Sequence, residues 1–217
     1  RFGPAGELYY LSHAKNGDWV LVWPGTYKEA VTIAPTAQLT SGLHVRGMNR
    51  NGVLLEGKGL SGSGIHVSGV DNTWVQNMSA QHYKAGSSNG FYWTGVDGYW
   101  GNYLTAYDNG DYGLYAYDST SSGKLPSTFA HDYASWNADS GIYVGGCRDC
   151  NAVVTNSRAY KNAIGYSGTA QYDYAPDVAR AFVMAASSGR AGAAVYNAPG
   201  VAASMEEACS SYATWRA

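Results

Sequence analysis

Two aspartates with matched surroundings are the strongest candidates for chemistry in this sequence. Asp111 and Asp139 each stand two residues before a glycine that opens a Gly-apolar-aromatic-apolar phrase, and Ser88 holds the same place before an earlier phrase. If the phrases are successive turns of one structure, the two carboxylates lie within a few ångströms of each other. Such a pair raises one carboxyl pKa or binds a hard cation such as Ca²⁺. The alternative is that both aspartates only cap backbone N–H groups in turns.

Further charged residues stand near this pair in the sequence. Asp108 and Asp132 fall on neighbouring turns, and Lys161 and Arg158 are the basic residues closest to the acidic segments. His131 precedes Asp132 directly, and adjacent residues of a strand point to opposite faces, so only one of them can join a given surface cluster. The candidate catalytic residues are therefore Asp111, Asp139, Asp108 and Lys161, and the candidate Ca²⁺ ligands are Asp111 and Asp139.

A row of aromatic side chains is the second candidate feature. The third position of each Gly-apolar-aromatic-apolar phrase carries a ring, and a row of such rings on one face can pack against the apolar faces of sugars. The competing interpretation is aromatic packing between neighbouring strands, with the hydroxyl groups exposed. The candidate substrate-binding row consists of His66, Tyr92, Tyr115, Tyr143 and Tyr166.

These candidates depend on an internal repeat. The phrases begin at Gly64, Gly90, Gly113 and Gly141, so the glycines are separated by 26, 23 and 28 residues, and a degenerate copy follows at 164–167. A second set of segments ends in an alanine that is followed three residues later by an amide or ring. The equivalent positions after these alanines are Tyr83, Asn109, Asn137 and Asn162.

A period in the twenties with short strands between Gly and Asn residues predicts a solenoid of stacked coils. The alternation in phrases such as Ile65-His66-Val67 gives one residue to each face in turn, which is the period of a strand and excludes a helix. We therefore expect the asparagines to stack in a ladder about 4.8 Å apart. An inner apolar row is expected from Ile65, Phe91, Leu114 and Ile142.

The composition limits the possible functions. Only 14% of the 217 residues are charged and the net charge is -2, which argues against a nucleic-acid surface. With 19 tyrosines among its aromatic residues the chain does not have a disordered composition. There is no apolar run of about 18 residues, so no membrane span is expected. Cys147 and Cys150 favour a local disulfide or two free thiols, and Cys209 has no evident partner.

At this point a resemblance becomes specific. The phrase GDWVLVWPGTYKEAVTI at 17–33, followed by GIHV, NTWVQNMSA and GIYVGG, resembles the opening coils of the pectin-lyase-like superfamily, and more narrowly secreted bacterial right-handed parallel β-helix repeat proteins. The resemblance covers about 17–169. It implies an all-β, right-handed parallel β-helix in an extracellular carbohydrate-active protein. Relatives that cleave uronic-acid polymers use acidic residues to hold Ca²⁺ and a Lys or Arg as base, but no lyase motif matches here.

The last part of the chain has a helical rather than a strand-like pattern. The segment 177–186 is apolar at helical spacing, a short strand is expected at 194–197, and 204–207 opens a second helix with capping residues. This run is similar to a fragment of extended short-chain dehydrogenases that act as nucleotide-sugar epimerases. No strand-linked GxGxxG accompanies it, so no cofactor site is inferred. The expected division is a β-helix at 1–170 and a mostly helical tail or cap at 171–217.

Two functional hypotheses follow. In the first, an extracellular β-helix binds and cleaves a polysaccharide, as a lyase or glycoside hydrolase, along the aromatic row and the aspartate pair. In the second, the solenoid binds carbohydrate or serves a structural role without an active site. A lyase requires a basic residue within about 5 Å of the aspartate pair, because proton transfer needs direct contact.

Overall fold

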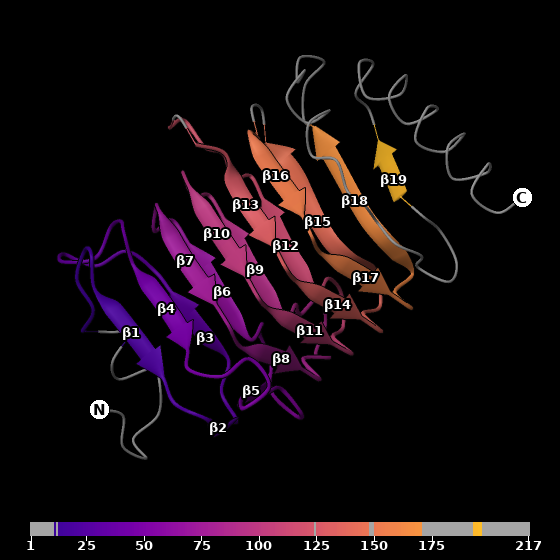
Figure 1. Ribbon diagram of the computed structural model, residues 1–217, viewed down its shortest axis with the longest axis horizontal. Coiled ribbons are helices and arrows are strands. Elements are labelled where there is room, and N and C mark those ends of the chain that lie inside the picture. Colours follow the sequence, from indigo (N-terminus) through magenta and orange to yellow (C-terminus); the bar gives the residue numbers. More distant parts are fainter. Residues whose placement is uncertain (1–10, 12, 124, 148–149, 171–192, 197–217) are drawn as a thin grey trace, which may run out of the picture.

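The chain forms a parallel β-solenoid whose strands stack along the long axis of the molecule (Figure 1). The computed structural model describes residue 11 and residues 13–123, 125–147, 150–170 and 193–196. Each coil contributes one strand to each of three parallel sheets, called A, B and C in the order in which the chain meets them. The predicted all-β parallel β-helix is therefore confirmed as a fold class, and it begins at Trp19 rather than only at the repeats.

Sheets A and B contain six strands each. Sheet A is formed by β1 (Trp19–Val22), β4 (His44–Gly47), β7 (Thr73–Gln76), β10 (Tyr99–Asn102), β13 (Ser127–Ala130) and β16 (Ala152–Thr155). Sheet B is formed by β2 (Gly25–Tyr27), β5 (Val53–Glu56), β8 (Ser79–Gln81), β11 (Thr105–Tyr107), β14 (Tyr133–Ser135) and β17 (Arg158–Tyr160).

Sheet C contains the Gly-led phrases of the repeat and has seven strands. Its members are β3 (Val31–Ile33), β6 (Ile65–Ser68), β9 (Phe91–Thr94), β12 (Leu114–Tyr117), β15 (Ser140–Cys147), β18 (Ile164–Ala170) and β19 (Ala193–Tyr196). The short strand expected at 194–197 is thus found as β19, paired in parallel with β18. The helices expected in the tail lie outside the described residues.

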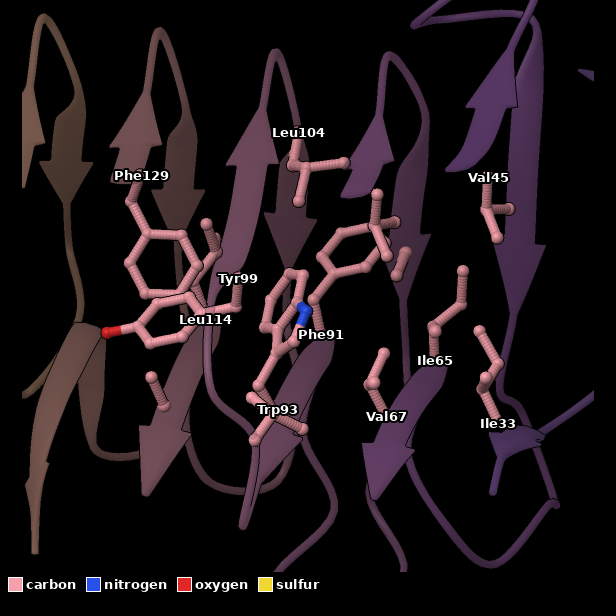
Figure 2. Close-up of a cluster of buried hydrophobic side chains, with 14 of the residues drawn as sticks. Ile33, Val45, Ile65, Val67, Phe91, Trp93, Tyr99, Leu104, Leu114 and Phe129 are labelled. Carbon is pink, nitrogen blue, oxygen red and sulfur yellow. The ribbon is translucent and has the colours of Figure 1, made fainter. Parts of the chain in front are cut away.

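The hydrophobic core fills the inside of the coils. Alternation places every second residue of each strand inward, and Figure 2 shows Ile65, Phe91 and Leu114 in successive coils. These residues and Ile142 are at most 3% exposed, which confirms the predicted inner row. Around them, the rings of Trp93, Tyr99 and Phe129 pack with centroids 5.3 to 6.1 Å apart. Burial of such large apolar groups is the main stabilising contribution to the solenoid.

The predicted asparagine ladder is present and fully buried. The Nδ2 atom of Asn109 donates to Oδ1 of Asn137 at 2.9 Å, and Nδ2 of Asn137 donates to Oδ1 of Asn162 at 2.9 Å. Each Oδ1 also accepts the backbone N–H of the preceding member. In the coil before, Tyr83 occupies the same place, and its N–H donates to Asn109. Buried amides are satisfied in this way, so the ladder stabilises the corner between sheets B and C.

Close approach of the coils explains the glycine of the repeat. A Cβ atom added at Gly113 would lie 2.5 Å from the carbonyl oxygen of Gly141 and 2.7 Å from the Asn137 amide nitrogen. Gly90 shows the same crowding, with the Gly113 carbonyl oxygen at 2.7 Å. The glycine is therefore required by contact with the next coil, because no side chain fits between the ladder and the strand.

Two further features complete the fold. Cys147 and Cys150 form a disulfide, which decides between the two alternatives left open by the sequence. Cys209 lies outside the described residues. Within the part of the chain that the structure describes, no helix has the length and apolar character needed to span a membrane.

Candidate functional site

The outer face of sheet C carries most of the predicted aromatic row. The register pairs His66 with Tyr92, Tyr92 with Tyr115 and Tyr115 with Tyr143. The rings of His66 and Tyr92 stack 4.3 Å apart, and those of Tyr92 and Tyr115 stack 4.5 Å apart. Tyr143 meets Tyr115 edge-on at 5.1 Å and is 9% exposed. Four of the five predicted members therefore share one row.

The prediction for Tyr166 was wrong. Tyr166 pairs with Ile142, and Ser167 takes the outer place beside Tyr143. Tyr166 is consequently 3% exposed and belongs to the inner row. The reason is that Gly165, rather than Ile164 as the repeat suggested, aligns with Gly141 of the preceding phrase, so a shift by one residue turns the Tyr166 side chain to the other face.

Stacking within the aromatic row determines which parts of the rings are accessible to a sugar. Parallel rings about 4.5 Å apart occupy each other's faces, so a pyranose cannot stack on the middle members. The row instead presents ring edges and phenol groups, one per coil. The geometry thus matches the cross-strand packing interpretation, with recognition left to hydrogen bonds.

Asp111 and Asp139 lie on adjacent coils beside this row, as the spacing predicted. The N–H of Asp139 donates to the Asp111 carbonyl oxygen at 3.0 Å, and the N–H of Asp111 donates to Ser88 in the same way at 3.0 Å. Both aspartates are half-buried. Burial, and then the nearby charge of Asp139, raise the pKa of the Asp111 carboxyl. Ser140 donates its hydroxyl to Asp139 at 2.9 Å.

Tyr112 connects the aspartate pair to the aromatic row. Its ring lies 4.4 Å from that of Tyr115 and 5.1 Å from that of Tyr143. Burial, followed by the charges of Asp139 and Asp111, raises the phenol pKa of Tyr112, so its hydroxyl stays protonated and can donate to a ligand. We call Tyr92, Tyr112, Tyr115, Asp111 and Asp139 the sheet C site.

Lys161 and Asp108 do not join this site. The Nζ atom of Lys161 lies 4.5 Å from the ring centroid of Trp136 and 5.2 Å from that of Tyr160, in two cation–π contacts. Asp108 instead contacts Lys84 and His82, at 2.7 and 3.7 Å. The predicted grouping of Asp108 and Lys161 with Asp111 and Asp139 is therefore wrong. The cause is that Asp108 and Lys161 both stand at the turn that follows a sheet B strand.

Asp132, a further neighbour considered from the sequence, points inward. It is 2% exposed, it accepts the Leu104 N–H at 2.7 Å, and its Oδ2 atom has no hydrogen-bond partner among the described residues. Burial raises its carboxyl pKa well above the ordinary value, although the nearby Arg50 guanidinium opposes this. His131 faces outward and stacks on Tyr103 with ring centroids 4.6 Å apart.

A second aromatic row was not predicted. On the outer face of sheet A, Trp19, His44, Trp74 and Trp100 are paired in register, and their ring centroids lie 4.1 to 5.6 Å apart. The signal was available, because Trp74 and Trp100 each stand six residues before the alanine of the second repeated segment, Ala80 and Ala106. Trp19 is 54% exposed at the end of this row.

The donor set does not form a cage for Ca²⁺. Among the described residues, no three His, Cys, Asp or Glu side chains gather as possible ligands. Since Ca²⁺ takes about six to eight oxygen ligands, the pair of Asp111 and Asp139 alone is insufficient. No reaction step is therefore derived through a metal.

Comparison with known proteins gives a limited result. The sequence matches no protein-family profile and no curated protein. Among solved structures, a pectin methylesterase in complex with a hexasaccharide is 15% identical, with a TM-score of 0.49, over 81% of this chain and 72% of that chain. A point mutant of a pectin methylesterase, with another hexasaccharide, is 16% identical, with a TM-score of 0.49, over 87% of this chain and 55% of that chain.

Proposed function

We propose that this chain binds an extracellular polysaccharide across the outer face of sheet C. The observation that carries the proposal is the in-register row of Tyr92 and Tyr115 beside the Asp111 and Asp139 pair. Successive coils are about 4.8 Å apart, which is close to the length of one sugar unit in an extended chain. A polymer lying along the solenoid axis therefore meets one phenol group per coil.

Hydrogen bonding rather than ring stacking is the mode of recognition. The faces of Tyr92 are occupied by His66 and Tyr115, so its phenol group is the part left for a ligand. Asp111 and Asp139 add acceptors for sugar hydroxyl groups at the edge of the row. Among the described residues no ion pair joins a Lys or Arg to either carboxylate, so the arrangement lacks the base that a lyase needs, and binding is the function it supports best.

Replacing Tyr92 by phenylalanine tests the proposal. The Tyr92→Phe variant keeps the stack and removes only the hydroxyl, so binding should weaken while the melting temperature changes little. Affinity electrophoresis through gels containing pectate, alginate or a neutral glucan measures the effect. The matched control is Tyr107→Phe, since Tyr107 is exposed on sheet B and away from the sheet C site. Equal retardation of the wild type and Tyr92→Phe in every gel would contradict the proposal.

A second candidate function is cleavage at the aspartate pair. It is favoured by the raised pKa of the Asp111 carboxyl beside Asp139, because a carboxyl group that holds its proton more readily is suited to act as a general acid. The test is a screen on the same polymers with and without EDTA, in which unsaturated products and reducing ends are measured separately. Loss of activity in Asp139→Ala supports cleavage, and no activity in the wild type rejects it.

A further inference from the structure

An open pocket lies at the corner between sheets B and C, outside the sheet C site. Its volume is about 620 Å³, within the usual range for small-ligand sites. It spans three successive coils, the second (β4–β6), the third (β7–β9) and the fourth (β10–β12). The second coil contributes Lys58 and Leu60, the third His82 and Lys84, and the fourth Asp108. We call this feature, lined also by Ser61, the corner pocket.

A chain of polar contacts fixes the polar wall of the corner pocket. The Nδ1 atom of His82 lies 3.0 and 3.1 Å from the two carboxylate oxygens of Glu56. On the other side, Nε2 of His82 lies 3.7 Å from Oδ2 of Asp108, which is too long for a hydrogen bond. Lys84 donates to Oδ1 of Asp108 at 2.7 Å. Asp108 therefore keeps Oδ2 available as an acceptor next to a lysine donor.

The backbone holds these side chains in place before any ligand arrives. His82 and Asp108 are in the left-handed region, at φ of 60° and 53°, and stand at the same turn position in adjacent coils. Each N–H at these positions donates to the next coil, from His82 to Tyr107 and from Asp108 to Ser135. Among residues other than glycine, Asp and His adopt this conformation more readily than most, so both fit the turn that the coil requires here.

The pairing of charges identifies the class of ligand. Lys84 neutralises Asp108, and Glu56 orients the His82 ring, so the pocket wall presents a donor and an acceptor side by side. Leu60 and Ala85 add an apolar portion to the lining. Adjacent hydroxyl groups on a sugar ring need one acceptor and one donor side by side, together with an apolar surface for the C–H bonds.

We infer that the corner pocket binds a single sugar unit through a vicinal diol. Oδ2 of Asp108 accepts one hydroxyl and Nζ of Lys84 donates to its neighbour, while His82 lines the site with its ring held by Glu56. This inference does not depend on the sheet C site, because the two sites share no residue. The remaining cation, Lys58, determines whether a sugar acid is preferred over a neutral sugar.

Titration with galactose, glucose, mannose and galacturonate tests the inference, with the ring signals of His82 followed by nuclear magnetic resonance. The variant is Asp108→Asn, because asparagine tolerates the left-handed backbone and only the charge is lost. The matched control is Asp118→Asn, the same change at an exposed left-handed position with φ of 49°, outside the pocket. We expect at least one sugar to shift the His82 signals, and Asp108→Asn to weaken its binding about tenfold, the loss of one charge-assisted hydrogen bond.

Several results would overturn the inference. No shift with any of the four sugars rejects the pocket as a sugar site, and equal binding by Asp108→Asn and the wild type rejects the diol contact. Binding of galacturonate alone that is lost in Lys58→Gln but kept in Asp108→Asn would show a simple ion pair instead. Tyr92→Phe should leave the shifts of the His82 signals on sugar addition unchanged. Failure of the sheet C proposal can therefore be told apart from failure of the corner-pocket inference.

Discussion

The guanidinium group of Arg50 extends from the second coil to the fifth, where its Nη1 atom donates to the carbonyl oxygen of His131 at 3.0 Å. On the way, Nε donates to Oγ1 of Thr105 at 2.8 Å and Nη2 donates to the Leu104 carbonyl oxygen. Arg50 thus ties three coils together along the corner between sheets A and B. Only the planar fork of arginine can satisfy these acceptors at once.

Arg50→Lys should therefore destabilise the protein although the charge is retained. The three donors of lysine lie on one nitrogen and cannot span the separate acceptors of the guanidinium fork, so at least one carbonyl group loses its partner, and we expect a loss of about 1–3 kcal/mol in the free energy of unfolding. Urea denaturation measures this value. Arg46→Lys is the matched control, because Arg46 is exposed on sheet A. Similar effects of the two substitutions would show that the corner contacts contribute little.

Asp132→Asn should stabilise the protein at neutral pH. Burial raises the Asp132 pKa above its ordinary value near 3.8, so the folded state holds a proton that the unfolded state releases. The stability contribution of Asp132 is fully present below that value and is lost as the pH rises through the folded pKa. Asparagine can still accept the Leu104 N–H but carries no charge, so we expect a gain of about 1–3 kcal/mol at pH 7.

The pH dependence distinguishes this explanation from a simple packing effect. The difference between Asp132→Asn and the wild type should shrink as the pH falls through the ordinary value of 3.8, below which the carboxyl group is protonated in both states. Denaturation curves measured across this range provide the check. Asp118→Asn, at an exposed position, should show no such trend. A constant difference at all pH values would contradict burial of the charge as the cause.

Asn137→Ala should break the ladder at its centre. The substitution removes the acceptor of the Asn109 backbone N–H and side-chain amide, and it removes one of the two donors to Oδ1 of Asn162, all in a buried corner. Unsatisfied buried groups cost free energy, and we expect a loss of about 2–4 kcal/mol in stability. Asn51→Ala, at an exposed turn position, is the control and should change stability by less than about 0.5 kcal/mol.

The inner parts of the fold were predictable because they repeat. The rows through Leu114 and Asn137 follow directly from the phrases, since every coil must fill the same space. The outer contacts were harder to predict, because the coils differ in length by several residues and each outer position depends on the local register. Tyr166 shows this clearly: one residue of offset moved it from the surface to the core.

The contacts of the turn residues could also be predicted only in part. His82, Asp108, Trp136 and Lys161 each precede one member of the row formed by Tyr83 and the three ladder asparagines, so the sequence could have aligned them. Doing so places Trp136 between Asp108 and Lys161 and predicts that these two charges do not meet. The same alignment could not predict the contact between His82 and Glu56, because this contact joins a turn to the end of β5 in the previous coil.

Gly113→Ala and Gly123→Ala should change stability in opposite directions. At Gly113 the new Cβ atom would lie 2.5 Å from the Gly141 carbonyl oxygen and 2.9 Å from the Ala134 Cβ atom, so the coils must move apart. We expect a loss of about 1–3 kcal/mol, the usual cost of overpacking.

At Gly123 a Cβ atom would meet nothing within 4 Å, and the backbone is not left-handed there. Alanine then reduces the freedom of the unfolded chain and should stabilise the protein by about 0.4–1 kcal/mol. Thermal and urea denaturation of both variants measure the contrast. If Gly113→Ala were as stable as the wild type, the coils would have to separate without cost, and close approach could not be the reason for the repeated glycine.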